Sequence, residues 1–337
     1  SLGLVGSEMC IRDRPRLLRT ASYNWYSPLG QWRYDPPENI TQEADFTSLS
    51  YPGLGRVEGG KDEIGRVYRA AGEVSSADQD RADLPRFSLR GEVAEDVLVP
   101  LPGDYFTLWV ETQDMEKNSI GSTRVTPRHA VLDVAVRWQA PFDVEQAPFA
   151  ADAKQRQIDL LVPLAERELL EQWVQRWKLR EGSFDEKMRR LRLRFAEEFR
   201  YSTWQAAQTS AQADATVIRR FLQQSKTGHC EHFASAAALM LRQAGIPTRY
   251  TVGYAVQEYD APRQEWLLRG RHAHAWVRAW DAATQRWRDV DVTPAAGVGL
   301  GVAPLQGWQG MVDAWQRWRE DFTVWRTQEE HLSLIHI

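Results

Sequence analysis

A helix that begins at a cysteine and leads into strand-like runs is the pattern that most constrains this fold. Between residues 227 and 235 the chain reads TGHCEHFAS. Apolar residues then recur every three or four positions, which predicts one apolar helix stripe, formed by Phe233, Ala236, Ala237, Met240, Leu241 and Ala244. Gly245 and Pro247 are typical of a helix end. The partial positive charge of a helix N-terminus lowers a thiol pKa, so Cys230 is a candidate nucleophile.

Three strand-like runs follow the helix. TRYTVGYAV is rich in β-branched and aromatic residues, and its alternation predicts a shared face for Tyr250, Val252, Tyr254 and Val256. HAHAWVRAW and QRWRDVDVT are joined by a polar turn and predict a hairpin. With a four-residue turn centred between Ala282 and Ala283, cross-strand partners are fixed. The predicted pairs are Trp280 with Gln285, Trp276 with Asp289, and His274 with Asp291.

This register brings an imidazole and a carboxylate together. Opposed side chains lie within about 5.5 Å at Cβ, so Asp291 can hold one ring nitrogen of His274 while the other reaches Cys230. The three side chains would then be an orienting carboxylate, a base and a nucleophile. Asp289 is the alternative for the carboxylate, but it is predicted opposite Trp276. The backbone N–H of Cys230 is a natural oxyanion donor, and we guess that Trp204 lies near a second one.

The motifs G-x-C-E-H-F-A, H-A-W-V and D-x-T-P resemble those of the bacterial transglutaminase-like superfamily, most closely its TgpA-type subgroup of membrane-anchored periplasmic domains. The resemblance covers about residues 227–294 and extends weakly upstream into RLLRTASYNWYSPLGQWRY and VLVPLPGDYF. It implies an α+β fold with a papain-like transglutaminase core, in which the helix bearing the nucleophile packs on an antiparallel sheet. It also implies a preceding β-rich sandwich-like domain and a catalytic triad of Cys230, His274 and Asp291.

Three positions depart from the family pattern. Val292 stands where the family usually has proline, and Arg278 stands where glutamate is common. His229 stands where the subgroup more often has an aromatic residue, which changes the surroundings of the thiol. No departure removes a member of the implied triad.

The resemblance implies a thiol-dependent acyl transferase of the protein-glutamine gamma-glutamyltransferase type, acting through a thioester. Its implied partners are a glutamine donor in a protein or peptide, an amine acceptor, and a membrane bound through segments missing from this fragment. The implied location is periplasmic or extracytoplasmic, with a tether to the inner membrane. A cysteine peptidase or amidase with the same triad, and a catalytically silent envelope scaffold, are the alternatives. We expect no cofactor.

Zinc binding is the rival chemistry for the same residues, since Cys230, His232, His272 and His274 are all possible ligands. Zinc ligands typically come in matched pairs two to five residues apart, and His272 and His274 would need the helix start very close to their strand. We therefore expect no metal. We place His272 on the strand face of His274, beside it or towards solvent, and expect Glu231 and His232 to line the first helical turn.

Composition is that of a globular, multi-domain chain, with 337 residues, 43% hydrophobic residues and a net charge of −4. Arginines at residues 189–194 alternate with Leu191 and Leu193. This spacing favours a solvated helix face over a basic surface that binds nucleic acid. No run reaches the roughly 18 apolar residues of a membrane helix, and no cleavable signal is evident. We expect no nucleic-acid partner.

Five segments are predicted. Residues 15–150 hold short strand runs and form the β-rich domain, and residues 151–306 form the catalytic domain. The latter opens with a helical stripe that starts at Leu161 and Leu164, followed by the helices FDEKMRRLRLRFAEEF and ADATVIRRFLQQ.

The remaining segments lie at the ends. Residues 307–331 form an amphipathic helix that packs on the protein or approaches a membrane, with a stripe of Trp308, Met311, Trp315, Trp318, Phe322 and Trp325. Residues 1–14 and 332–337 resemble translated sequencing adapter and are expected to be non-native. Cys230 would then be the sole native cysteine, because Cys10 lies in the first of these tails. A lone thiol in an oxidising compartment favours a chemical role.

Overall fold

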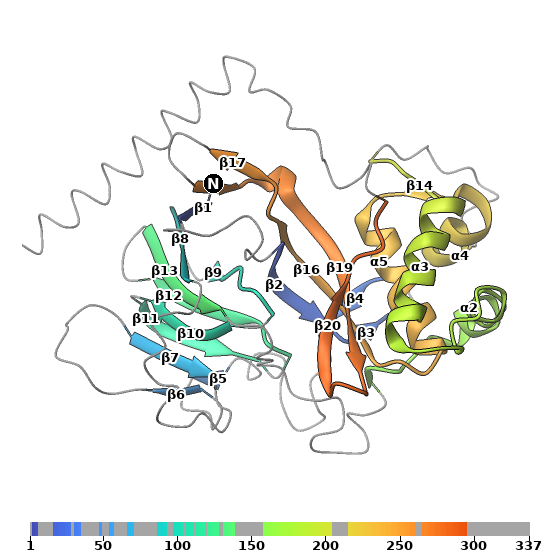
Figure 1. The fold of residues 1–337 in the computed structure, drawn as a ribbon, viewed down its shortest axis with the longest axis horizontal. Coiled ribbons are helices and arrows are strands. Elements are labelled where there is room, and N and C mark those ends of the chain that lie inside the picture. The colour runs from blue at the N-terminus through green and yellow to red at the C-terminus, as the bar shows by residue number, and fades with distance from the viewer. Residues whose placement is uncertain are drawn as a thin grey trace, which may run out of the picture.

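The structure is a computed structural model. It describes residues 2–5, 16–27, 30–34, 47–48, 54–56, 66–70, 86–92, 97–103, 105–110, 112–118, 120–127, 131–138, 158–203, 215–260 and 265–294. Figure 1 shows helices gathered beside one antiparallel sheet, and further strands from the first half of the chain beyond it. The predicted α+β class is confirmed.

One antiparallel sheet carries the motifs at the C-terminal side of the chain. Its strand order is β2 (Leu17–Tyr23), β16 (Thr248–Ala255), β19 (Ala273–Asp281) and β20 (Arg286–Val290). Strand β2 belongs to the segment predicted as the β-rich domain, yet it pairs with β16 along most of its length. The strand pairing therefore joins the two predicted domains.

Helix α5 (Cys230–Gln243) lies at the centre of the core, packed between β19 and β16 on one side and α2 (Leu164–Arg176) and α4 (Val217–Arg219) on the other (Figure 1). The sequence predicted one apolar stripe, but the helix is buried on every side from Phe233 to Arg242. Its run of alanines permits this because small side chains let neighbouring elements approach closely. Arg242 is satisfied there by bonds to Thr248 and to backbone carbonyls.

Two further helical segments complete the α-helical layer. They are α3 (Phe184–Glu198) and the π-helix η3 (Arg220–Ser225), which continues α4. Buried aromatic rings join these segments at centroid separations of 5.0 to 6.5 Å; they belong to Trp173, Trp177, Phe195, Phe199, Phe221 and Phe233. The predicted start of the first stripe is wrong, since Leu161 lies before α2 and is exposed, and Leu164, the first residue of α2, is 81% exposed.

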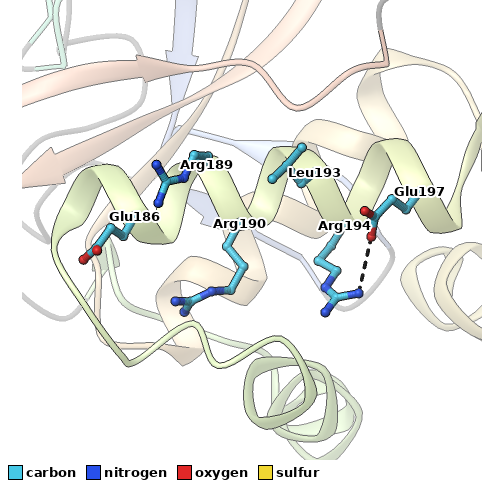
Figure 2. A pocket seen from close by; sticks show the side chains of 6 residues that line it. All are labelled: Glu186, Arg189, Arg190, Leu193, Arg194 and Glu197. Carbon is cyan, nitrogen blue, oxygen red and sulfur yellow. Dashed lines mark hydrogen bonds and ion pairs between the residues drawn. The ribbon is translucent and has the colours of Figure 1, made fainter.

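The outer side of α3 carries the predicted solvated arginine face. A pocket on this side is lined by residues of α3 (Figure 2), namely Glu186, Arg189, Arg190, Leu193, Arg194 and Glu197. A capping box between Ser183 and Glu186 starts the helix.

Two more antiparallel sheets draw mainly on the first half of the chain, and the short strands β3 (Trp25–Tyr26) and β4 (Trp32–Arg33) form a further antiparallel pair. The larger has the order β17 (Glu258–Asp260), β18 (Glu265–Leu268), β1 (Leu2–Val5), β8 (Arg86–Glu92), β13 (Val131–Trp138), β10 (Tyr105–Val110), β7 (Arg66–Ala70), β6 (Leu54–Arg56). The smaller has the order β5 (Thr47–Ser48), β11 (Thr112–Lys117), β12 (Thr123–Pro127), β9 (Val97–Leu98). Strand β1 lies in the predicted non-native tail and pairs with β18 and β8; the origin of that tail stays a prediction.

The hairpin forms with a different register from the predicted one. Trp280 pairs with Trp287 and Arg278 with Asp289, so the turn is centred between Ala283 and Thr284. The predicted turn came one residue too early, because Asp281 stays in the strand and its carboxylate accepts the N–H of Ala283 at 3.1 Å. Every predicted partner is therefore displaced by two residues, an even shift that keeps each side chain on its predicted face.

Strand β16 forms where it was predicted, and Tyr250 and Val252 both pack against the core that holds α5. Thr248, Arg249, Tyr250 and Thr251 are all buried, because both faces of this half of the strand are covered. Tyr250 packs in the core with α5, while Arg249 pairs with buried Asp159 at 3.1 Å on the opposite face.

In the part of the chain described here, none of the helices is both long and apolar enough to cross a bilayer. The predicted amphipathic helix at 307–331 and the tail at 332–337 lie outside the described residues.

Candidate active site

Cys230 is the first residue of α5, and its thiol is partly buried against the core. The preceding strand β15 (Thr227–Gly228) pairs in parallel with β14 (Arg200–Tyr201), which fixes how the chain enters the helix. A Cβ at Gly228 would come within 2.8 Å of the His232 ring, so glycine is needed where that ring packs. The side chain of the N-cap residue His229 makes no capping hydrogen bond. Because Cys230 is the first residue of the helix, the positive end of the helix lies next to its thiol.

His274 lies near the start of β19 and is buried. Its Nε2 lies 2.8 Å from Oδ2 of Asp291. Its ring is also close enough to the Cys230 thiol for each group to shift the pKa of the other. Since Nε2 faces the carboxylate, the nitrogen left for the sulfur is Nδ1. The structure thus places the three predicted side chains close together, with a hydrogen bond between His274 and Asp291.

Asp291 follows directly after β20, where the chain leaves the sheet. In the observed register it is not opposite His274, as predicted, but lies diagonally from it. Two further bonds hold it: Oδ1 accepts the N–H of Thr293 at 2.9 Å, and the backbone carbonyl accepts Nε of Arg192 at 3.0 Å. The predicted contact therefore forms despite the wrong register.

The three groups shift one another's pKa. Burial alone raises the pKa of the Cys230 thiol, but hydrogen bonds from His229 and His274 outweigh it and lower this pKa to about 6. Burial lowers the pKa of His274, whereas Asp291 and Cys230 raise it to about 9. The pKa of Asp291 is raised by burial but lowered overall by His274. Between these values the site holds a thiolate, an imidazolium and a carboxylate.

Asp289, the rival carboxylate, has other partners. Its Oδ1 accepts the indole N–H of Trp276 at 2.9 Å and a guanidinium N–H of Arg278 at 3.1 Å. Trp276 in turn stacks on His274, with ring centroids 6.2 Å apart and planes 16° from parallel. Asp289 is therefore linked to the imidazole through an aromatic ring and not by a direct bond.

The prediction for His272 is wrong. It lies in the 3-10 turn η4 (Gly270–His272) before β19, not on the strand face of His274, and it is buried rather than facing solvent. The turn forms because its Nδ1 accepts the backbone N–H of Arg269 at 3.1 Å, and its Nε2 lies 3.4 Å from Glu258. Among the described residues, no group of three or more His, Cys, Asp or Glu is arranged to hold a metal ion.

Sequence reasoning missed several contacts of the site. The backbone N–H of Ala275 contributes to the lowered pKa of the Cys230 thiol, and Nε of Arg192 donates to the backbone carbonyl of Asp291. Trp276 had a signal, because residues two apart on a strand share a face, so it had to lie beside His274. Arg192 had none, since α3 and Asp291 are distant in sequence. Trp204 lies outside the described residues.

This arrangement coincides with a match to a known family. Residues 171–292 match the sequence model of the Transglutaminase-like superfamily, a stretch that includes Cys230, His274 and Asp291. This stretch is a transglutaminase-like domain. Its helix α5 and strands β16, β19 and β20 supply the site described above.

Two of the relatives share sequence with part of this chain. Over 100 residues the chain is 38% identical to the Protein-glutamine gamma-glutamyltransferase of Pseudomonas aeruginosa, a match that covers 30% of this chain and 14% of that protein. Over 71 residues it is 34% identical to the Uncharacterized protein YebA of Bacillus subtilis, covering 20% and 10% respectively. The chain thus matches only a small part of the length of each relative.

The fold has a solved counterpart beyond the transglutaminase-like domain. The crystal structure of the periplasmic domain of TgpA from Pseudomonas aeruginosa superposes with a TM-score of 0.56 and covers 86% of both chains at 18% identity. A likeness at this identity establishes the fold. Because the match covers 86% of this chain, the shared fold includes β-rich elements as well as the transglutaminase-like domain.

Proposed function

We propose that this chain is a thiol-dependent acyl transferase of the protein-glutamine gamma-glutamyltransferase type, with Cys230, His274 and Asp291 as its catalytic triad. The Cys230 thiolate attacks the carboxamide carbon of a glutamine side chain. His274 gives its Nδ1 proton to the departing nitrogen, so ammonia leaves and a thioester forms. An amine then attacks the thioester, His274 takes its proton, and the thiolate is released as the new amide forms.

The observation that carries this proposal is the hydrogen bond between His274 and Asp291 beside Cys230, the first residue of α5. A thiolate is the reactive form of cysteine, and the lowered pKa of about 6 makes it the main form at neutral pH. Asp291 holds the imidazole by Nε2, which keeps Nδ1 directed at the sulfur. The backbone N–H of Cys230 at the helix start is suited to stabilise the tetrahedral oxyanion.

The glutamine and amine substrates are proposed from the likeness to the glutamyltransferase of Pseudomonas aeruginosa. A protein or peptide glutamine is the proposed acyl donor, and an amine is the acceptor. Because the same thioester can be cut by water, a peptidase or amidase would use the same three residues. Kinetic measurements therefore have to decide whether an amine or water resolves the thioester.

The proposed setting is the bacterial envelope. Similarity to the periplasmic domain of TgpA supports a periplasmic or extracytoplasmic location. We propose that the full-length protein is tethered to the inner membrane by segments outside this sequence. In such an oxidising compartment, the free state of Cys230 is consistent with chemical use.

The test is incorporation of a fluorescent amine into a glutamine-containing protein, comparing the unmodified chain with Cys230→Ala. We expect labelling with the former and none above background with the latter. Release of ammonia or peptide cleavage without labelling would instead identify a hydrolase. Absence of all three activities in the unmodified chain would favour the silent scaffold.

A further inference from the structure

Trp276 lies against one face of the His274 ring. The two ring centroids are 6.2 Å apart and the ring planes are 16° from parallel, which is an offset stack. The two residues are two positions apart along β19, so their side chains leave the same face of the strand. Both side chains are buried, and Trp276 is only 1% exposed. The indole therefore covers one side of the imidazole.

A hydrogen bond fixes the orientation of the indole. Its N–H donates to Oδ1 of Asp289 at 2.9 Å. The same oxygen accepts Nη1 of Arg278 at 3.1 Å, so the carboxylate has a cation as its second partner. The acceptor is a single oxygen, which an amide side chain would also supply. Trp276 is therefore tied to β20 through Asp289.

The cation behind this carboxylate is itself buried. The side chain of Arg278 is 1% exposed, and its Nη2 donates to the carbonyl of Trp287 at 3.4 Å. A Cβ on Gly103 would lie 1.8 Å from Nη1 of Arg278, so glycine is needed where the first half of the chain passes the guanidinium. A buried guanidinium stays with its partners because their loss would leave a charge without solvation. Asp289 and the indole are therefore held by a fixed support.

We propose that Trp276 is a positioning residue for His274, which holds the plane of the imidazole so that Nδ1 is directed at the Cys230 sulfur. This inference rests on the proposed role of His274 in proton transfer. The χ2 torsion of a histidine varies widely, and the bond from Nε2 to Asp291 fixes only one edge of the ring. A flat ring packed against the face of the imidazole restricts the remaining rotation.

Trp276 exchanges no proton with the substrate in the proposed reaction. His274 gives a proton to the departing nitrogen and takes one from the attacking amine, and both transfers need Nδ1 close to the reacting atoms. A small displacement of a group that transfers protons slows the chemical step more than it weakens substrate binding. The expected sign of lost positioning is therefore a lower kcat at a similar KM.

The test compares Trp276→Leu with Trp280→Leu. Trp280 is a matched control, because it lies on the same strand, is 5% exposed and packs its ring on Trp287 at 5.5 Å. Steady-state kinetics of amine incorporation measures kcat and KM for both variants. We expect kcat to fall about 10- to 100-fold for Trp276→Leu and less than about threefold for Trp280→Leu, with KM changed by less than about threefold in each.

A second measurement needs no substrate. In chain with isotopically labelled histidine, NMR follows the Nε2 proton that His274 donates to Asp291, assigned by its loss in His274→Gln. We expect a sharp downfield resonance in the unmodified chain and in Trp280→Leu. We expect it to be broadened or absent in Trp276→Leu, because a mobile ring exchanges this proton with water.

Thermal unfolding of each variant is measured first. If Trp276→Leu does not fold, Trp276→Phe and Trp280→Phe replace the pair, and we expect a difference in the same direction because phenylalanine lacks the N–H that bonds Asp289. Equal kcat values and equal resonances in folded variants at the two positions overturn the proposal. A resonance lost only on substitution of Trp276, in a chain that incorporates no amine, would support the positioning role and defeat the proposed function.

Discussion

At the scale of single residues, the chemistry depends on which groups contact the sulfur and the imidazole. Burial raises the pKa of the Cys230 thiol, whereas His229, His274 and the backbone N–H of Ala275 lower it. His274 is held between this thiolate and the carboxylate of Asp291. Each neighbour stabilises the charged form of the next, so removal of one group changes the protonation of the others.

Asp291→Asn removes the negative charge beside His274 and keeps the size of the side chain. We expect kcat/KM for amine incorporation to fall by roughly 10²- to 10⁴-fold, because the imidazolium loses its partner and its fixed orientation. The matched control is Asp289→Asn, since that carboxylate contacts Trp276 and Arg278 instead. We expect a loss below about tenfold for the control, and equal losses would contradict the role given to Asp291.

The pH dependence of kcat/KM follows from the two shifted groups. Cys230 must be deprotonated to attack, and His274 must be protonated to release ammonia. The rate should therefore rise through about pH 6 and fall through about pH 9. Steady-state kinetics from acid to alkaline pH checks this, and an acid limb at the ordinary thiol pKa of about 8.5 would show that the thiol is not activated.

At the scale of helices and strands, local patterns were the reliable part of prediction. The apolar spacing after Cys230 predicted α5, and alternating runs predicted β19 and β20. The hairpin register depended on whether Asp281 belonged to the strand or the turn, which a side-chain bond to Ala283 decides. Because the resulting shift was even, the contact of His274 with Asp291 survived the error.

The pairing of β2 with β16 depends on a close backbone approach at Gly253. A Cβ at this position would lie 2.0 Å from the carbonyl oxygen of Leu18, which cannot move without disturbing β2. We expect Gly253→Ala to destabilise the fold by about 1–3 kcal/mol or more. Gly270→Ala is the control, since a Cβ there meets no atom within 4 Å; we expect its effect to stay within about 0.5 kcal/mol. Chemical denaturation measures both, and equal effects would mean that the close approach is not required.

At the scale of the whole molecule, long-range contacts set the limits of prediction. No sequence pattern indicated that β2 would join the C-terminal sheet, or that Arg192 of α3 would hold the backbone of Asp291. Both contacts connect segments far apart in the chain, and periodicity reports only on neighbours. The contact of His274 with Asp291 could be predicted because both residues lie in one hairpin, whose strands and turn have a local sequence pattern. The contacts that β2 and Arg192 make with this part of the fold could not be predicted.

The proposed domain boundary at residue 151 can be tested through β2. A fragment of residues 151–306 retains Cys230, His274 and Asp291 but lacks this strand, which leaves β16 as an exposed edge. We expect the fragment to have a lower Tm than the full chain and a tendency to aggregate. Thermal unfolding with light scattering checks this, and a monodisperse fragment with an unchanged Tm would show that the segment folds independently.

The central claim, that Cys230 forms a thioester with a glutamine substrate, is tested most directly by intact-mass measurement. The full chain is mixed with a glutamine peptide in the absence of amine and quenched in acid at short times. We predict an adduct equal to the peptide less one ammonia, located at Cys230, removed by added amine and absent from Cys230→Ala. Amine incorporation without such an adduct on the unmodified chain, or an adduct that persists in Cys230→Ala, would contradict the mechanism.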